Sequence, residues 1–405
     1  MKSDASRSMH FCASALKHVE TVRPQVAAGS SSISAPRAQN TLDLANLDLL
    51  RALAVGLVFI GHLLGTMKIR GFGELGHFGV LLFFVHTSLV LMLSMQRLGL
   101  SGRKLYVAFM VRRVFRIYPL SIAAVLCAIA FQIPSTSWLG GYVWRGWLTV
   151  LSNLFLVQNI THSGSVNCVL WSLPFEVQMY AVLPVLFIIL RRYPSIGAAW
   201  GAWAAGVVLA TAEYLIRGGG PAEGDLLLRY FPCFIAGILA WWLLERRQGT
   251  LSGGYWILTL VLLVFAYRLA DSIRVYGPAL ALALHGTLRN DHQIWWPPGM
   301  ELVNDWGFCC LTGLAIPLFA DIRSKWLNAT TKSIARYSYG IYVCHVPILW
   351  LIFVKLHIAS LEIGALLSLI LTLLMSVALY NFLENPTIRL GKRLASQLTY
   401  SGITA

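Results

Sequence analysis

Charged residues are scarce in this chain: Asp, Glu, Lys and Arg make up 12% of its 405 residues, against about 25% in soluble domains. Hydrophobic residues account for 57%, and the mean hydropathy is +0.67. This composition excludes an ordinary cytosolic enzyme. The apolar residues gather in windows of about 17 to 22 residues, which is the length a helix needs to cross about 30 Å of hydrocarbon. The sequence therefore indicates a protein that crosses a membrane many times.

Acidic residues are the scarcer kind, 17 against 32 Lys and Arg. The cations recur at the ends of apolar windows and not as one stripe with interleaved aromatics, so we attribute them to the positive-inside rule and expect no nucleic-acid partner. The seven cysteines lack the spacing of a disulfide framework or a zinc site, and no metal is expected. No internal repeat is present, which weakens the interpretation as an inverted-repeat transporter.

Residues 1–44 contain no apolar stretch, so they are neither a secretory signal peptide nor a span. They are rich in Ser, Ala and Arg and poor in acids, which predicts a disordered cytoplasmic tail. An organellar transit peptide ranks second, because the segment lacks a clear amphipathic stripe. Residues 45–386 are predicted to form the membrane domain, and residues 387–405 a short basic cytoplasmic tail.

The predicted fold is an all-α integral membrane protein with about ten transmembrane helices and both termini cytoplasmic. The window 147–160 is assigned to a re-entrant or interfacial hairpin, because an eleventh crossing would place Arg191 and Arg192 outside. The longest outer connection, 271–301, is long enough to act as a lid or binding element. The ten spans are 48–67, 76–96, 117–133, 170–190, 197–216, 226–244, 253–270, 302–320, 337–354 and 362–382.

The first span carries two ionisable residues, Arg51 and His62. Eleven residues separate them, which returns both to within roughly 20° of one helix face and about 16 Å apart along the axis. A histidine at that depth is a functional-site hypothesis. The alternative, which is equally favoured, is that His62 forms a structural hydrogen bond between packed helices.

Two further segments hold charged candidates. Arg113 and Arg116 lie one turn apart at the predicted inner end of the third span, where their guanidinium groups would suit phosphate. An ordinary positive-inside flank that contacts lipid headgroups explains the same charges. Glu176 lies about a turn inside the next span. It could orient His62 as an imidazole–carboxylate pair, or pair structurally with an Arg or Tyr.

Near the end of the chain, Tyr342 and His345 share one helix face inside an apolar span. No further metal ligands stand at compatible spacing, so catalysis or hydrogen bonding is expected of them. Trp171, at the start of the segment that contains Glu176, joins them as a second-tier candidate for substrate contact.

Taken together, these segments resemble the membrane acyltransferase-3 family from residue 47 to about 386. The family's Leu-Asp-x-Leu-Arg-Ala opening, with a histidine eleven residues after the arginine, is present around Arg51 and His62, and its Arg-x-x-Arg as Arg113 and Arg116. One departure is Ser88, where the family usually has glycine, which changes how closely two helices can approach. The remaining matches run from Trp171 to Pro184, from Tyr337 to His345, and from Glu384 to Pro386.

The resemblance implies an O-acyltransferase of the cell (plasma or inner) membrane. It would move an acetyl or other short acyl group from cytoplasmic acyl-CoA to a hydroxyl of an extracytoplasmic saccharide or glycan. Acyl-CoA is then a co-substrate, and no permanently bound cofactor is expected. The rival class is a non-enzymatic translocator of glycans or lipid-linked saccharides. The acyl group, a covalent acyl-histidine and a homo-oligomer are left open.

Each candidate residue receives a role from this resemblance. Arg113 and Arg116 would hold the phosphates of CoA, and Arg51 would steady the inner end of the donor path. His62 would act as general base or carry the acyl group, with Glu176 orienting it. Second-tier candidates for substrate binding or oxyanion stabilisation are Tyr342, His345 and Trp171.

Overall fold

The computed structural model describes residues 45–69, 72–135, 141–217, 226–246, 249–285 and 299–400, with the backbone alone for 275–285. The predicted tail 1–44 and residues 286–298 of the predicted outer loop lie outside this part. Within it the chain is helical, and one parallel bridge between Leu251 and Phe319 is the sole extended pairing. The all-α prediction is confirmed.

Nine helices of the described part are long and apolar enough to cross a bilayer. Each contains most of a predicted span, because a continuous apolar run can be buried in lipid only as a helix. The elements are α1 (Ala45–Thr66), α2 (Gly73–Leu98), α3 (Gly102–Ala130), α4 (Gly146–Phe155), η1 (Cys168–Ser172), α5 (Leu173–Arg192), α6 (Ile196–Ile216), α7 (Leu227–Leu244), α8 (Gly253–His285), α9 (Met300–Ala315), η3 (Ile316–Leu318), α10 (Lys325–Leu349), η4 (Trp350–Lys355), α11 (Leu361–Leu379), η5 (Tyr380–Glu384) and α12 (Asn385–Tyr400).

The predicted eighth span, 302–320, is shorter than expected. Its helix α9 has 16 residues, or about 24 Å, and the short turn η3 follows it. That length alone falls short of about 30 Å of hydrocarbon. The helix packs against α2, α7 and α8, and it buries a carboxylate, Asp305. It is an interior helix of the bundle, so nine helices meet the length expected of a span instead of ten.

The segment predicted as a hairpin, 147–160, contains the ten-residue helix α4. A helix of about 15 Å cannot cross a bilayer, so the prediction that this segment does not cross is confirmed. The chain then turns back toward η1, and the Asn153 side chain holds this return. Its Nδ2 donates to Gly164 O at 3.0 Å, and its Oδ1 accepts from Val166 N at 3.0 Å.

Three predicted boundaries are wrong in the same direction. The helix α3 begins at Gly102 and not at 117, α8 continues to His285 through half of the predicted outer loop, and the predicted basic tail continues as α12 to Tyr400. Hydropathy marks only the apolar part of a helix, and the polar extension of each helix was therefore missed. As a result Arg113 and Arg116 lie within α3 and not before it.

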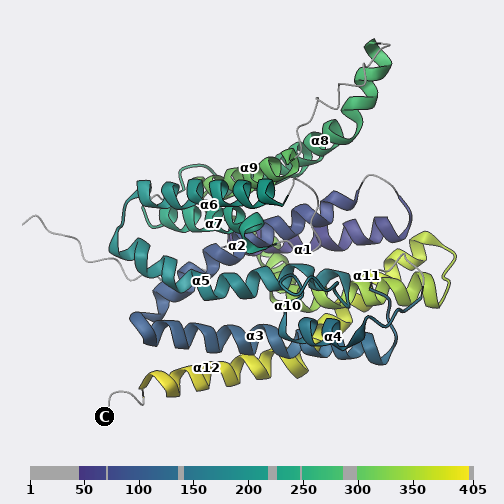
Figure 1. The fold of residues 1–405 in the computed structure, drawn as a ribbon, viewed down its shortest axis with the longest axis horizontal. Coiled ribbons are helices and arrows are strands. Elements are labelled where there is room, and N and C mark those ends of the chain that lie inside the picture. The colour runs from purple at the N-terminus through teal and green to yellow at the C-terminus, as the bar shows by residue number, and fades with distance from the viewer. Residues whose placement is uncertain are drawn as a thin grey trace, which may run out of the picture. The chain divides into compact units, whose positions relative to one another are not determined.

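Close helix crossings surround α2, which packs on α1 and α7 (Figure 1). A Cβ atom at Gly79 would lie 2.6 Å from Ala54 O of α1, so only glycine allows this approach. On the other side Ser88 packs against Gly237 of α7, where a Cβ would lie 2.9 Å from Ser88 Cβ. The sequence has serine at position 88, where the family usually has glycine. Gly237 on the facing helix α7 instead provides the room for the close approach.

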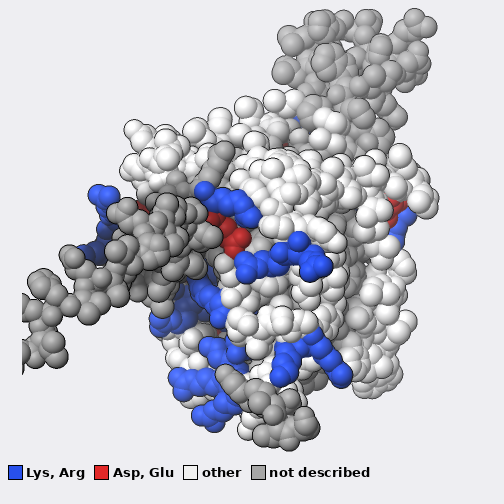
Figure 2. Space-filling view, turned by 90° about the vertical axis from the view of Figure 1, so that its left-hand side faces the viewer, with Lys and Arg blue, Asp and Glu red and all other residues white. Residues whose placement is uncertain are grey.

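One end of the bundle is basic. Arg97 closes α2, Arg191 and Arg192 close α5, and Arg191 lies 3.5 Å from Glu245 at the end of α7. Figure 2 shows Lys and Arg side chains gathered on this face, which we call the basic end. The positive-inside rule predicts that the basic end is cytoplasmic.

The α1–α2 crossing gives a first test. Gly79→Ala should lower the free energy of unfolding by about 1–3 kcal/mol, because the new methyl group overpacks the crossing. Gly56→Ala is the matched control, since no atom lies within 4 Å of a Cβ there. Thermal unfolding in detergent measures both, and equal midpoints for the two variants would show that the crossing tolerates the methyl group.

Candidate active site

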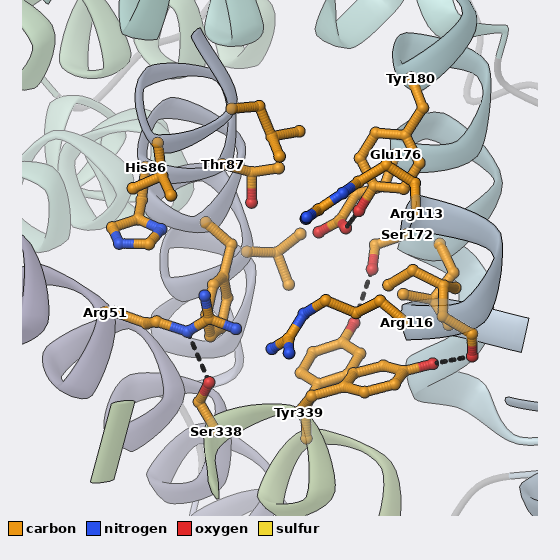
Figure 3. Close-up of a pocket in the computed structure, with 17 residues that line it drawn as sticks. Arg51, His86, Thr87, Arg113, Arg116, Ser172, Glu176, Tyr180, Ser338 and Tyr339 are labelled. Atoms are coloured by element: carbon orange, nitrogen blue, oxygen red, sulfur yellow. Dashed lines mark hydrogen bonds between the residues drawn. The ribbon is translucent and has the colours of Figure 1, made fainter. Parts of the chain in front are cut away.

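Three arginines line one pocket between α1, α2, α3, α5 and α10. Arg51 enters from α1, Arg113 and Arg116 enter from α3, and Glu176 of α5 faces them (Figure 3). The cavity among these side chains measures about 70 Å³, which is smaller than the roughly 300–1,000 Å³ of typical ligand sites. The structure therefore brings together all three arginines that the sequence assigned to CoA. We call this site the arginine pocket.

Helix α10 holds the arginine pocket together from below in Figure 3. Its Ser338 Oγ accepts a hydrogen bond from Arg51 Nε at 2.6 Å, which fixes the guanidinium of α1. The next residue, Tyr339, donates its hydroxyl proton to Ile117 O of α3 at 2.8 Å. One helix thus sets the separation of the two helices that carry the arginines.

The charges of the arginine pocket do not balance. Arg116 Nη1 lies 3.0 Å from Glu384 Oε1, and the Glu384 side chain is fully buried. Glu176 accepts a hydrogen bond from Tyr180 at 2.7 Å. Among the described residues neither Arg51 nor Arg113 forms an ion pair, and Arg113 Nε is buried without a hydrogen-bond partner. Buried guanidinium groups left without carboxylates suit an anionic ligand, above all a phosphate.

His62 lies toward the end of α1, and its ring is partly exposed. Its Nδ1 lies 2.9 Å from Val58 O, and because a carbonyl oxygen only accepts, Nδ1 carries the proton of the neutral ring. The lone pair is then on Nε2, which lies 4.0 Å from Cys168 Sγ. This tautomer gives the ring a basic nitrogen that points away from its own helix.

His345 of α10 is arranged in the same way. Its Nδ1 donates to Ile341 O at 3.0 Å, and its Nε2 is buried with no hydrogen-bond partner among the described residues. The rings of His62 and His345 meet edge to face, with 5.0 Å between centroids. The two mid-membrane histidines of the sequence therefore form one contact pair on α1 and α10.

The sequence hypothesis of an imidazole–carboxylate pair requires Glu176 to lie beside His62, and the structure places it elsewhere. It lines the arginine pocket, which His62 does not, and Tyr180 one turn away on α5 donates to it. His62 instead contacts Cys168, in the turn of η1 that precedes α5. The pairing fails because Glu176 lies two helical turns further along the chain than the residue that meets His62.

The second-tier residues divide between two places. Tyr342 lines the arginine pocket, and its hydroxyl donates to Val169 O at 2.6 Å and lies 2.7 Å from Ser172 Oγ. Because the proton of Tyr342 is already donated, this hydroxyl is an unsuitable oxyanion donor in this arrangement. Its ring lies 6.3 Å from that of His345, so Tyr342 separates the arginine pocket from the histidine pair.

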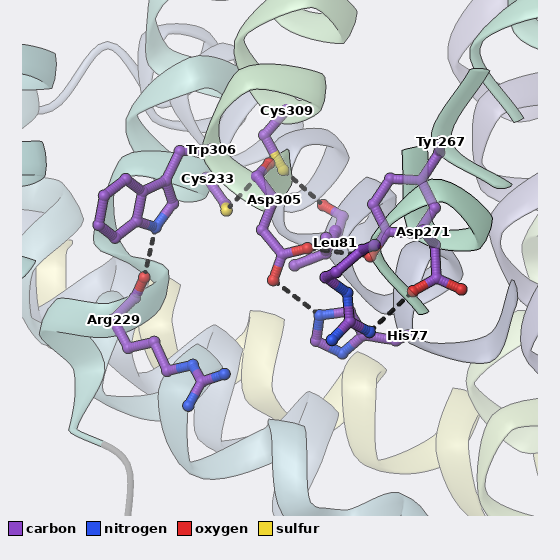
Figure 4. Close-up of polar contacts among 10 residues, drawn as sticks. His77, Leu81, Arg229, Cys233, Tyr267, Asp271, Asp305, Trp306 and Cys309 are labelled. Atoms are coloured by element: carbon purple, nitrogen blue, oxygen red, sulfur yellow. Dashed lines mark hydrogen bonds and ion pairs between the residues drawn. The ribbon is translucent and has the colours of Figure 1, made fainter. Parts of the chain in front are cut away.

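Trp171 belongs to a different cluster, which sequence reasoning missed. It stacks on His77 of α2 with ring centroids 6.0 Å apart. His77 Nε2 donates to Asp305 Oδ2 at 2.8 Å, and Tyr267 donates to Asp305 Oδ1 at 2.9 Å (Figure 4). This network satisfies a buried carboxylate and joins α2, α8 and α9. Asp305, a carboxylate inside the apolar window 302–320, is the feature of the sequence that could have revealed this cluster.

Glu384 was also missed as a site residue. It was quoted only as part of a closing motif, although its ion pair with Arg116 ties η5 to α3. The helical turn before α12 is widened at Tyr380–Glu384, a local distortion that is frequent at functional sites. No local sequence pattern predicts that this carboxylate forms an ion pair with an arginine on α3.

These features define a multi-pass membrane protein with a cationic pocket beside a pair of histidines. A family model described as an acyltransferase domain matches residues 44–381. The match covers most of the chain, which therefore belongs to the membrane acyltransferase-3 family that its motifs resembled. No curated protein and no solved structure matches the chain. The protein is a multi-pass membrane acyltransferase.

The Arg116–Glu384 pair yields a second prediction. Arg116→Met should lower the free energy of unfolding by about 3–5 kcal/mol, because it leaves the fully buried carboxylate of Glu384 without a partner. Glu384→Gln should lower the free energy of unfolding by a smaller amount, because the Arg116 side chain that loses its partner keeps 22% of its surface exposed. Thermal unfolding of both variants, with the double variant Arg116→Met/Glu384→Gln completing a cycle, measures the coupling. Additive losses would show that the two groups do not interact.

Proposed function

We propose that this protein transfers an acetyl or other short acyl group from acyl-CoA to a hydroxyl of an extracytoplasmic saccharide or glycan. The observation that carries the proposal is the arginine pocket, where Arg51 and Arg113 lack carboxylate partners within the described part of the chain. Family membership supports the transfer of an acyl group. The plasma membrane or the bacterial inner membrane is the proposed location.

The donor is proposed to enter from the basic end. Arg113 has a buried donor nitrogen without a partner and is proposed to contact a CoA phosphate directly. Arg116 already pairs with Glu384, so it contributes less to phosphate binding and more to the position of α3. Glu176 is proposed to limit the excess positive charge of the pocket instead of orienting His62.

The chemistry is proposed at His62 Nε2, which carries the lone pair in the observed hydrogen-bond arrangement. As general base it takes the proton of the acceptor hydroxyl while that oxygen attacks the thioester carbonyl. The C–S bond then breaks, and the CoA thiolate receives the proton. In the second route, Nε2 attacks the thioester carbonyl, the C–S bond breaks and the CoA thiolate leaves. The acyl group then passes from Nε2 to the acceptor hydroxyl, the Nε2–acyl bond breaks, and the hydroxyl proton is taken up by the thiolate. His345, in ring contact with His62, is proposed to hold the imidazole in place.

Arg113 gives a third prediction. Arg113→Gln should raise the KM for acyl-CoA by about tenfold to a hundredfold, the effect of losing one hydrogen bond between charged groups. Its effect on kcat should be smaller, because Arg113 contacts the remote phosphates. Arg112→Gln is the matched control, since the neighbouring Arg112 does not line the pocket. An unchanged KM in Arg113→Gln would contradict the phosphate role.

His62 gives a fourth prediction. His62→Ala should abolish acyl transfer, because the only group proposed to accept the proton is removed. The variant should still be stabilised thermally by CoA, as the arginine pocket is intact. Transfer at the wild-type rate would end the proposal for His62. A wild-type protein that CoA does not stabilise would favour the saccharide translocator.

A further inference from the structure

Two pockets lie at the end of α3 that is opposite the basic end. The first is an apolar groove between α3, α10 and α11, helices that pack side by side (Figure 1). The groove is open to its surroundings, and its cavity volume is about 510 Å³. Ala123 and Ala124 of α3 and Leu379 of α11 are among its lining residues. Among the described residues of its wall, Lys355 at the end of η4 is the only charged one.

The second pocket has a mostly apolar lining that also carries polar and aromatic side chains, and we call it the polar pocket. It lies between the end of α3 and α4, has a cavity volume of about 300 Å³, and counts Tyr142, Trp144 and Arg145 among its lining residues. Arg145 Nη2 donates to Ser135 Oγ at 3.1 Å, which holds the guanidinium at the pocket wall. Ile133 lines both this polar pocket and the apolar groove, so the two spaces adjoin.

The polar pocket also adjoins the proposed reaction centre. Its wall includes Ser135 and Val166, and Ser135 O accepts a hydrogen bond from Cys168 N at 2.7 Å. Cys168 Sγ is the atom that lies 4.0 Å from His62 Nε2. Two residues, Ser135 of the wall and Cys168 behind it, therefore connect the polar pocket to the His62 imidazole.

We propose that the acceptor is a lipid-linked saccharide, with its long apolar chain in the groove and its sugar in the polar pocket. This inference rests on the proposed function and names the class of its acceptor. Lys355 and Arg145 then bind the phosphate linkage between chain and sugar. Trp144 and Tyr142 offer flat aromatic surfaces with polar edges to the sugar ring.

Charge and continuity favour this occupant over an ordinary bilayer lipid. No acidic residue lines either pocket among the described residues, and each wall carries one cation. A linkage of one or two phosphates would meet both cations. A phospholipid needs the groove alone and leaves the aromatic pocket beside His62 unused. An amphiphile with a chain, a phosphate linkage and a sugar uses both.

Binding of geranylgeranyl diphosphate to the full-length protein in detergent tests the inference. The probe should raise the unfolding temperature, and it should do so at lower concentration than geranylgeraniol, inorganic diphosphate or phosphatidylglycerol. Lys355→Gln and Arg145→Gln should each weaken the response by about tenfold, because each removes one charged contact to phosphate. Ala124→Trp should abolish it by filling the groove.

Two controls keep the outcome decisive. Ala204→Trp makes the same substitution at an exposed position of α6 outside the groove and should leave the response unchanged. His62→Ala should also keep it, so that failure of lipid binding and failure of acyl transfer are separate results. Equal stabilisation by phosphatidylglycerol, or a full response in Ala124→Trp, would overturn the inference.

Discussion

Three guanidinium groups inside a bundle of apolar helices are the feature on which the rest of the site depends. Arg51, Arg113 and Arg116 face two carboxylates, Glu176 and Glu384, at a depth where an unpaired charge is costly. Several parts of the fold serve to hold them. The long polar start of α3 carries two of the arginines inward, and the widened turn η5 presents Glu384 to Arg116. The remaining positive charge suits the anionic donor proposed for this pocket.

Helix α10 converts that charge cluster into a defined site. Ser338, Tyr342 and His345 are spaced at four and three residues, so they share one face of the helix. Along this face Ser338 holds Arg51, Tyr342 meets η1, and His345 meets His62. Since α10 also packs against α3 through Tyr339, one helix determines the distance between the anion site and the histidines.

The order of these groups along the bundle fits a transfer between two compartments. The arginine pocket lies nearer the basic end, Tyr342 separates it from the histidine pair, and the polar pocket lies on the far side of Cys168. In the proposed reaction the donor and the acceptor therefore approach one imidazole from opposite ends. The tautomer imposed by Val58 O leaves the basic nitrogen of His62 facing the acceptor side.

The sequence by itself determined the membrane class, most helices and the family, because apolar runs and motif spacing are local properties of the chain. It also placed Arg51 within the first helix, and Arg113 and Arg116 at the inner end of the third span. Only the tertiary structure decided which neighbours those residues meet: Glu176 lines the arginine pocket and does not reach His62, and Glu384 pairs with Arg116. Helical periodicity gives the face on which a side chain lies but not the helix that packs against that face. That choice depends on contacts between residues hundreds of positions apart, such as His77 and Asp305 or Arg51 and Ser338.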